Sequence, residues 1–106
     1  MSANILIVDD EPTMRLLARR LLHKAGLEAD LAGSVSEAIA RLEQGEYEVA
    51  VIDLYLPDSS GFALLDWLRE HRPDTVAVVL SGTTVLQDVI AAMQRGAFDF
   101  VTKPLV

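Results

Sequence analysis

Apolar residues along this chain follow two different spacings. Short continuous apolar runs occur at Ile5–Val8, Val49–Ile52 and Val76–Leu80, each bounded by polar or turn residues. Runs of this length are typical of strands in a parallel sheet, and Val49–Ile52 in particular is expected to be buried on both faces. Between the runs, apolar residues recur every three or four positions, as they do on one face of a helix. The pattern therefore predicts strands that alternate with helices.

Turn residues delimit four predicted helices. The clearest helix start is Ser34-Val35-Ser36-Glu37, which has the Ser-x-x-Glu form of a capping box. Glycine and proline mark the ends, because glycine adopts the conformation that closes a helix and proline cannot continue one. The predicted helical segments run from Pro12 to a stop at Gly26, from Ser34 to Gly45, from Phe62 to Pro73, and from Val85 to Arg95 with a stop at Gly96.

Two weaker strands complete the alternation. In Leu27–Leu31 apolar and polar residues alternate, which suits the edge of a sheet, and Phe98–Val101 is a short final strand. Strand and helix thus alternate four times and the pattern ends on a strand. Right-handed crossovers of this kind build an α/β fold with a parallel five-stranded sheet and helices on both faces.

A fifth helix is expected after Val106 to cover the remaining face of the sheet. Burying three or four apolar side chains of such a helix would contribute roughly 5–10 kcal/mol, which is about the whole stability of a small domain. We therefore expect residues 1–106 to be one domain that is truncated before this helix, or whose open face is covered by a partner or a neighbouring segment.

Composition narrows the classes of function. The chain has 106 residues, 51% of them hydrophobic, which excludes intrinsic disorder. No apolar run approaches the ~18 residues of a membrane span, so a cytoplasmic location is expected. The absence of cysteine excludes disulfides and thiolate metal sites, and two histidines make a zinc site improbable. A net charge of −7 argues against direct nucleic-acid binding and favours a cation or a basic protein as ligand.

Polar residues of one kind gather where the predicted strands end. The carboxyl ends of parallel strands lie along one edge of the sheet, where open α/β folds bind ligands. The residues at these ends are Asp9, Asp10, Asp53, Ser81 and Lys103. Two carboxylates ~5 Å apart repel by roughly 3 kcal/mol at an effective dielectric constant of 20. A divalent cation would remove this conflict; oxygen ligands favour Mg²⁺ or Ca²⁺, and so small a ligand set suits Mg²⁺.

Each of these residues alone also has an ordinary structural explanation. Asp53 could cap the strand end or the next helix, and the acids before Pro12 could simply complement a helix N-terminus. Ser81 could be a turn residue, and Lys103-Pro104 a surface turn. Their convergence on one edge of one sheet favours a functional site.

Four segments carry a resemblance to a known family. The chain resembles the receiver domain of two-component response regulators over essentially its whole length. That family has a flavodoxin-like (CheY-like) sheet with strand order 2-1-3-4-5. The matching segments are Ile5-Leu6-Ile7-Val8-Asp9-Asp10-Glu11, the Asp53-x-x-x-Pro57-x-x-x-Gly61 loop, Val79-Leu80-Ser81-Gly82, and Gly96-Ala97-Phe98-Asp99-Phe100-Val101-Thr102-Lys103-Pro104.

The resemblance implies a phosphoacceptor site with Mg²⁺. Asp53 matches the carboxylate that takes a phosphoryl group from a sensor histidine kinase or a phosphotransfer protein. Asp9 and Asp10 match the acidic pair that holds Mg²⁺, with Asp10 as the direct ligand and Asp9 acting partly through water. Asp53 itself and the backbone carbonyl of Tyr55 match the other protein ligands. With no strong general base in view for the attacking water, at most slow self-dephosphorylation is expected.

The resemblance also implies a switch that reports phosphorylation. Lys103 matches the lysine that pairs with the phosphoryl oxygens and precedes a cis-proline, here Pro104. Ser81 matches the hydroxyl that turns toward the phosphoryl group, and Phe100 matches the aromatic switch residue on the fifth strand. The fourth helix and fifth strand would then form the surface that regulates an effector.

Two other functions compete with this interpretation. An enzyme of the haloacid-dehalogenase type also uses Asp, Mg²⁺ and Lys, but it needs an Asp-x-Asp motif, whereas Asp9 and Asp10 are adjacent. A receiver-like interaction module that is never phosphorylated is the other alternative.

A C-terminal effector domain and a homodimer are the further partners that the resemblance suggests. The bulky Tyr55, together with Thr83, is expected to alter the access of water and the lifetime of the phosphoryl group.

Overall fold

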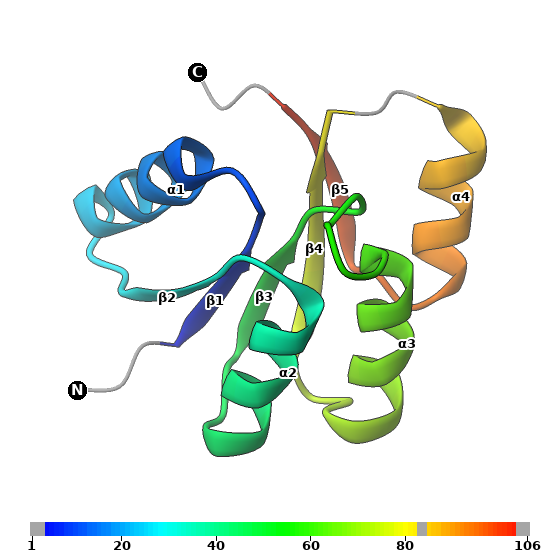
Figure 1. Cartoon of the computed structure of the whole chain (residues 1–106), viewed down its shortest axis with the longest axis horizontal. Coiled ribbons are helices and arrows are strands. Elements are labelled where there is room, and N and C mark those ends of the chain that lie inside the picture. The colour runs from blue at the N-terminus through cyan, green and yellow to red at the C-terminus, as the bar shows by residue number, and fades with distance from the viewer. Residues whose placement is uncertain (1–3, 83–84, 104–106) are drawn as a thin grey trace.

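The computed structural model describes residues 4–82 and 85–103. Its strands form one parallel sheet of order β2-β1-β3-β4-β5, as the resemblance implies (Figure 1). Four helices lie between the strands in the described part of the chain. The elements are β1 (Ile5–Val8), α1 (Pro12–Lys24), β2 (Ala29–Ala32), α2 (Val35–Gln44), β3 (Val49–Ile52), α3 (Gly61–His71), β4 (Val76–Ser81), α4 (Leu86–Gln94) and β5 (Asp99–Thr102).

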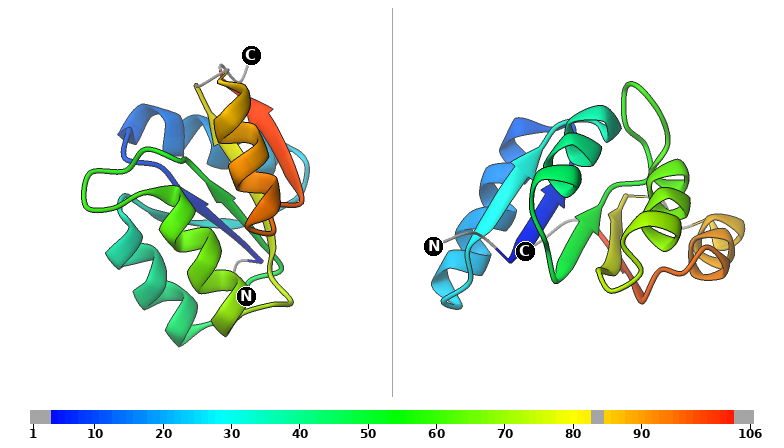
Figure 2. Two further views of the ribbon diagram at one scale, coloured as in Figure 1. Left: turned by 90° about the vertical axis from the view of Figure 1, so that its right-hand side faces the viewer. Right: turned by 90° about the horizontal axis from the view of Figure 1, so that it is seen from below.

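The helices divide unequally between the two faces of the sheet. α2, α3 and α4 lie in a row (Figure 2) and share the larger core cluster with alternate strand residues such as Leu6, Ala50 and Val79. α1 lies apart from them and contributes Ala18 to a second cluster with Ile5 and Ile7 of β1. Because successive strand residues point to opposite faces, α1 covers one face and the other three helices cover the opposite one.

β3 is less buried than its sequence predicts. Ala50 and Ile52, which face α2 and α3, are fully buried, but Val49 and Val51 on the α1 side are only half-buried. The prediction of a strand buried on both faces is therefore wrong for the α1 side, because α1 alone is too narrow to cover it. An apolar groove of about 190 Å³ remains there between α1 and the sheet. It is lined by Ile7, Ala18, Leu21, Leu22, Val51, Val78, Leu80 and Val101.

The predicted helix boundaries are close to the observed ones. The Ser34 hydroxyl accepts a hydrogen bond from the Glu37 N–H at 3.1 Å, and the Glu37 carboxylate accepts one from the Gly33 N–H at 2.5 Å. The capping box is thus formed, with its return bond shifted by one residue. Gly26 and Gly96, which follow α1 and α4, have positive φ angles of 82° and 97°, which only glycine adopts without strain.

The shorter strands are displaced slightly from their predictions. β2 begins at Ala29 rather than at Leu27, and β5 covers Asp99–Thr102 rather than Phe98–Val101. Strand ends are poorly marked in the sequence because pairing with a neighbour decides them. In the described part of the chain, no helix combines the length and the apolar character that crossing a membrane requires.

Candidate functional site

The sheet itself aligns the candidate residues. Three of them extend the parallel hydrogen bonding one residue beyond the strand ends: the Asp9 N–H donates to the Ala32 carbonyl at 3.0 Å, the Asp53 N–H to Val8 at 2.9 Å, and the Lys103 N–H to Ser81 at 2.9 Å. Parallel strands end along the same edge, so these bonds place the functional side chains side by side. The sequence predicts this convergence, and the structure confirms it.

Lys103 lies at the centre of the cluster. Its Nζ is 2.8 Å from Asp9 Oδ2, 3.0 Å from Asp53 Oδ2 and 3.8 Å from Glu11 Oε1. Asp9 and Asp53 are only 2% and 6% exposed, so water cannot screen their charges effectively. Lys103 therefore compensates part of the repulsion between carboxylates that the sequence predicts, because it pairs with two of them.

The two carboxylates determine the proton affinity of Lys103. Burial by itself would lower the pKa of the ammonium group, because it penalises the charged form. Hydrogen bonds with Asp9 and Asp53, together with the charges of these residues, outweigh burial and raise the pKa above its usual 10.5. Lys103 is thus a permanent cation at neutral pH, held beside the Asp53 carboxylate.

The acidic residues leave a charge that a divalent cation would match. Carboxylate oxygens of Asp9, Asp10 and Asp53 all lie within 4.8 Å of one another. These three carboxylates and the ammonium group of Lys103 together leave two negative charges, to which the nearby Glu11 adds a third. Asp10 is exposed whereas its two neighbours are buried, so the cluster opens toward solvent on one side. These residues fit a small, hard cation that keeps part of its water shell, as Mg²⁺ does.

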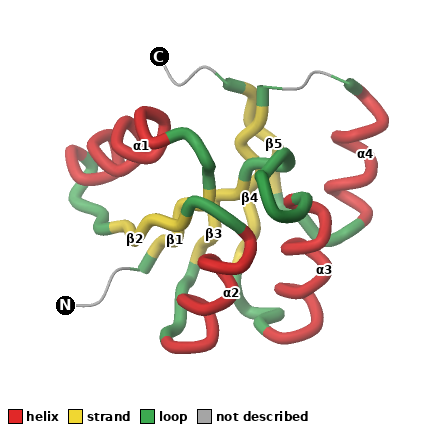
Figure 3. Tube along the Cα trace, in the orientation of Figure 1, coloured by secondary structure: helices red, strands yellow, loops and turns green. Residues whose placement is uncertain are grey.

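The loop after Asp53 (green in Figure 3) is closed tightly at its base. The Gly61 N–H donates to the Leu54 carbonyl at 2.7 Å, and a Cβ atom on Gly61 would lie 2.7 Å from the Leu54 Cα. Tyr55 and Ser60 face each other in an antiparallel bridge. Only glycine permits this close approach of the two ends of the loop.

Tyr55 is held next to the Asp53 carboxylate by its backbone. Its N–H donates to Asp53 Oδ1 at 3.2 Å, while Asp53 Oδ2 faces Lys103. Tyr55 as a whole is 56% exposed, and its hydroxyl donates a hydrogen bond to Asp88 on α4. The ligand role of the Tyr55 carbonyl stays a prediction.

The two predicted switch residues lie on neighbouring strands. Ser81 is fully buried at the end of β4, where it is paired with Thr102 of β5. Phe100 is half-buried against the larger core cluster, opposite Val79. Ser81 and Phe100 thus lie on adjacent strands, and their role as a switch stays a prediction. Thr83 and Pro104 lie outside the described residues, so the structure does not test the Lys103-Pro104 bond.

Three contacts around the site have no clear signal in the sequence. Arg15 of α1 donates from Nη1 to the Asp9 carbonyl at 2.7 Å, Tyr55 reaches Asp88, and Asp58 binds the start of α2. Arg15 stands three residues after Pro12, so a helical wheel could have placed it near the end of β1. The other two contacts join segments far apart in the sequence and depend on the path of a loop.

The chain matches the family model described as the response regulator receiver domain over residues 5–106. The photosynthetic apparatus regulatory protein RegA of Rhodovulum sulfidophilum is 39% identical over 102 residues, which cover 94% of this chain and 54% of RegA. The response regulator protein PilR of Pseudomonas aeruginosa is 36% identical over 100 residues, which cover 94% of this chain and 22% of PilR. The chain thus spans about half or less of the length of these curated relatives.

A solved structure supports the same assignment. A response regulator from Burkholderia pseudomallei, crystallised with a phosphorylated aspartic acid, a calcium ion and citrate, has a TM-score of 0.91 and 27% identity. The similarity covers 99% of this chain and 62% of that one. The chain belongs to the receiver-domain family of response regulators. It is a phosphoacceptor signalling domain, and the family assignment favours this class over an enzyme of the haloacid-dehalogenase type.

Proposed function

We propose that Asp53 accepts a phosphoryl group from the phosphohistidine of a sensor kinase or a phosphotransfer protein, with Mg²⁺ held by Asp9, Asp10, Asp53 and the Tyr55 carbonyl. The observation that carries the proposal is the buried Asp53 carboxylate, which shares Lys103 with Asp9 at 3.0 and 2.8 Å. A buried acid that already faces a fixed cation is arranged to stabilise extra negative charge.

Asp53, Lys103 and Tyr55 have different roles in the proposed phosphoryl transfer. An Asp53 oxygen attacks phosphorus as the bond from phosphorus to the histidine nitrogen breaks, which leaves an acyl phosphate and a neutral imidazole once a proton is taken up. Lys103 neutralises charge on the equatorial oxygens, and the Tyr55 N–H orients the carboxylate through Oδ1. Mg²⁺, when bound, supplies the remaining charge neutralisation.

We infer that the phosphorylated Asp53 hydrolyses only slowly. Hydrolysis of the acyl phosphate needs a water molecule and benefits from a general base near it. The two histidines of the chain have other partners: His23 contacts Glu28, and His71 stacks on Trp67. We therefore infer that the phosphorylated state lasts long enough to act as a signal.

The signal is proposed to leave through α4 and β5. Ser81 would turn toward the added charge and Phe100 would fill the space it leaves, which changes the adjacent surface. That surface exposes several large apolar side chains: Val85, Leu86, Ile90, Met93 and Phe98. Exposed apolar side chains gathered in this way are typical of a protein interaction surface.

The relatives suggest what this surface regulates. They include a DNA-binding transcriptional regulator, NtrC, and a solved NtrC4 receiver that forms a dimer when activated by beryllofluoride. An effector domain that follows residues 1–106 in a longer protein, and a homodimer formed on activation, are therefore part of the proposal. A cytoplasmic location stays a prediction from the sequence.

Beryllofluoride, a mimic of the phosphoryl group, tests the proposed function. In the presence of Mg²⁺ it should form one adduct per chain, with large amide shifts in nuclear magnetic resonance spectra at Asp53, Tyr55, Ser81 and Lys103. Asp53→Asn should remove these shifts, while the variant remains folded. Unchanged spectra of the natural sequence would contradict the proposal.

A further inference from the structure

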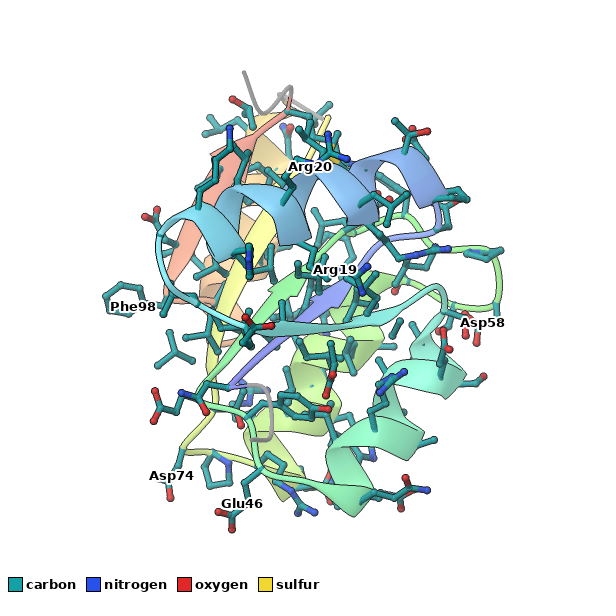
Figure 4. The ribbon with its side chains drawn as sticks, turned by 90° about the vertical axis from the view of Figure 1, so that its left-hand side faces the viewer. Arg19, Arg20, Glu46, Asp58, Asp74 and Phe98 are labelled. Carbon is teal, nitrogen blue, oxygen red and sulfur yellow. The ribbon has the colours of Figure 1, made fainter. Side chains whose placement is uncertain are left out.

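Asp58 joins the loop after Asp53 to a helix on another part of the sheet. It stands between β3 and α3, and its carboxylate accepts three hydrogen bonds from the first turn of α2. Oδ1 accepts from the Val35 N–H at 3.0 Å, and Oδ2 accepts from the Ser36 N–H at 3.0 Å and the Ser36 hydroxyl at 2.5 Å. Figure 4 shows Asp58 beside the start of this helix.

These bonds complete the N-terminus of α2. The first N–H groups of a helix have no partner within the helix. Here the Glu37 N–H is capped locally by Ser34, whereas the N–H groups of Val35 and Ser36 are capped by Asp58. The hydroxyl and N–H of Ser36, with the Val35 N–H, lower the pKa of Asp58 to about 2. The carboxylate is therefore ionised at neutral pH, which suits the positive end of a helix.

Both partners of this contact belong to segments that are connected to the candidate site. On one side, Asp58 sits within the loop that Tyr55 and Ser60 close by pairing with each other. On the other side, α2 follows directly from the end of β2, where the Ala32 carbonyl accepts the Asp9 N–H. Asp58 thus links the loop that carries Tyr55 to the β2–α2 segment, whose Ala32 carbonyl accepts a hydrogen bond from Asp9.

We propose that Asp58 is a positioning residue for the cation: it fixes the loop against α2 so that the Tyr55 carbonyl stays in place to bind Mg²⁺. The proposal rests on the proposed function, in which Tyr55 is a ligand. Without the contact, the loop would have to be ordered when the cation binds, and the entropy lost in ordering it would weaken binding.

Ser34→Ala provides a matched control for Asp58→Ala. Both substitutions remove hydrogen bonds from the N-terminus of α2, but only Asp58→Ala releases the loop. The Mg²⁺ dissociation constant, measured by amide shifts at Asp10 and Tyr55 with both variants fully folded, should rise roughly tenfold for Asp58→Ala. For Ser34→Ala the dissociation constant should stay within about twofold of the natural value. Losing this helix cap should lower only the melting temperature.

The outcomes separate this proposal from the proposed function. If the natural protein binds Mg²⁺ and Asp58→Ala binds it equally well, the positioning role is wrong and the proposed function stands. An equal loss of affinity in Ser34→Ala would also overturn it, because the effect would then come from α2 stability. If the natural protein itself binds no Mg²⁺, the proposed function fails and takes the role of Asp58 with it.

Discussion

The two ends of the sheet are both acidic, yet they differ in how the acids are held. At the amino end, a hollow of about 730 Å³ is bordered by Asp30, Glu46, Glu48 and Asp74 among other residues. Glu46 and Asp74 point outward there (Figure 4), and both are exposed. At the carboxyl end, Asp9 and Asp53 are buried and meet the same ammonium group, that of Lys103.

The two ends differ in whether their acids are buried around a shared counter-ion, and this property distinguishes the candidate site. The amino end has a hollow and four acids, but its acids do not share one buried counter-ion. Exposed carboxylates are screened by water and salt, so they interact weakly with one another. Buried carboxylates that share a counter-ion interact strongly, so a change in the charge of one of them changes the energy of the whole cluster.

The largest expected effect on stability comes from removing the shared counter-ion. Lys103→Met leaves Asp9 and Asp53 buried without a cation, which should cost about 3 kcal/mol of unfolding free energy. Mg²⁺ should restore part of this loss, because it supplies the missing positive charge. Urea unfolding with and without Mg²⁺ measures both effects.

A substitution at the opposite end serves as the control for Lys103→Met. Glu46→Gln removes an exposed charge and should change the unfolding free energy by less than ~0.5 kcal/mol. Equal effects of the two substitutions would remove the distinction between the two ends of the sheet.

The tight base of the loop gives the next largest effect. Gly61→Ala would bring a Cβ atom to 2.7 Å from the Leu54 Cα, and relieving this overlap should cost about 2 kcal/mol. Gly82→Ala is the matched control, because a Cβ at Gly82 meets no atom within 4 Å. Thermal unfolding of the two variants should therefore differ, and equal melting temperatures would show that the loop adjusts freely.

Apart from the control substitutions, the smallest effect on stability is expected at the amino end. Tyr47→Phe removes the hydrogen bond from the Tyr47 hydroxyl to Asp30, at 2.5 Å, and should cost about 1 kcal/mol. Mg²⁺ affinity should not change, because Tyr47 lies at the other end of the sheet. A loss of Mg²⁺ affinity in this variant would show that the two ends are coupled.

The same residue gives the amino end a pH dependence. Burial, followed by the hydrogen bond to Asp30, raises the pKa of Tyr47 above its usual 10.0. The folded state therefore holds the phenol proton more tightly than the unfolded state does. The contribution of this difference to the unfolding free energy is fully present below pH 10. It is lost as the pH rises through the higher pKa of Tyr47 in the folded state. Tyr47→Phe should lose less stability than the natural protein over that interval.

The sequence predicts which residues meet at the carboxyl end of the sheet, because parallel strands all end along the same edge. Once the apolar runs are assigned to strands, Asp9, Asp53, Ser81 and Lys103 must lie at one edge. Spacing alone does not predict the Lys103 pairing with Asp9, because it depends on the direction of a long side chain. The Asp58 bonds to α2 were missed for another reason: they depend on the path of a loop.

The half-burial of β3 was missed because a strand sequence records apolar character but not what covers each face. Val49 and Val51 are as apolar as Ile52, yet only the face with three helices is closed. Burial on the α1 side is decided by the width of the covering layer, which no local pattern contains.

Mapping a phosphoryl group on the chain tests the central claim most directly. Incubation with a small phosphodonor and Mg²⁺ should add one phosphoryl group per chain, and peptide mass spectrometry should locate it on Asp53. The Asp53→Asn variant should remain unmodified under the same conditions. A natural protein that stays unmodified, or a phosphoryl group that persists in Asp53→Asn, would contradict the assignment of Asp53 as the phosphoacceptor.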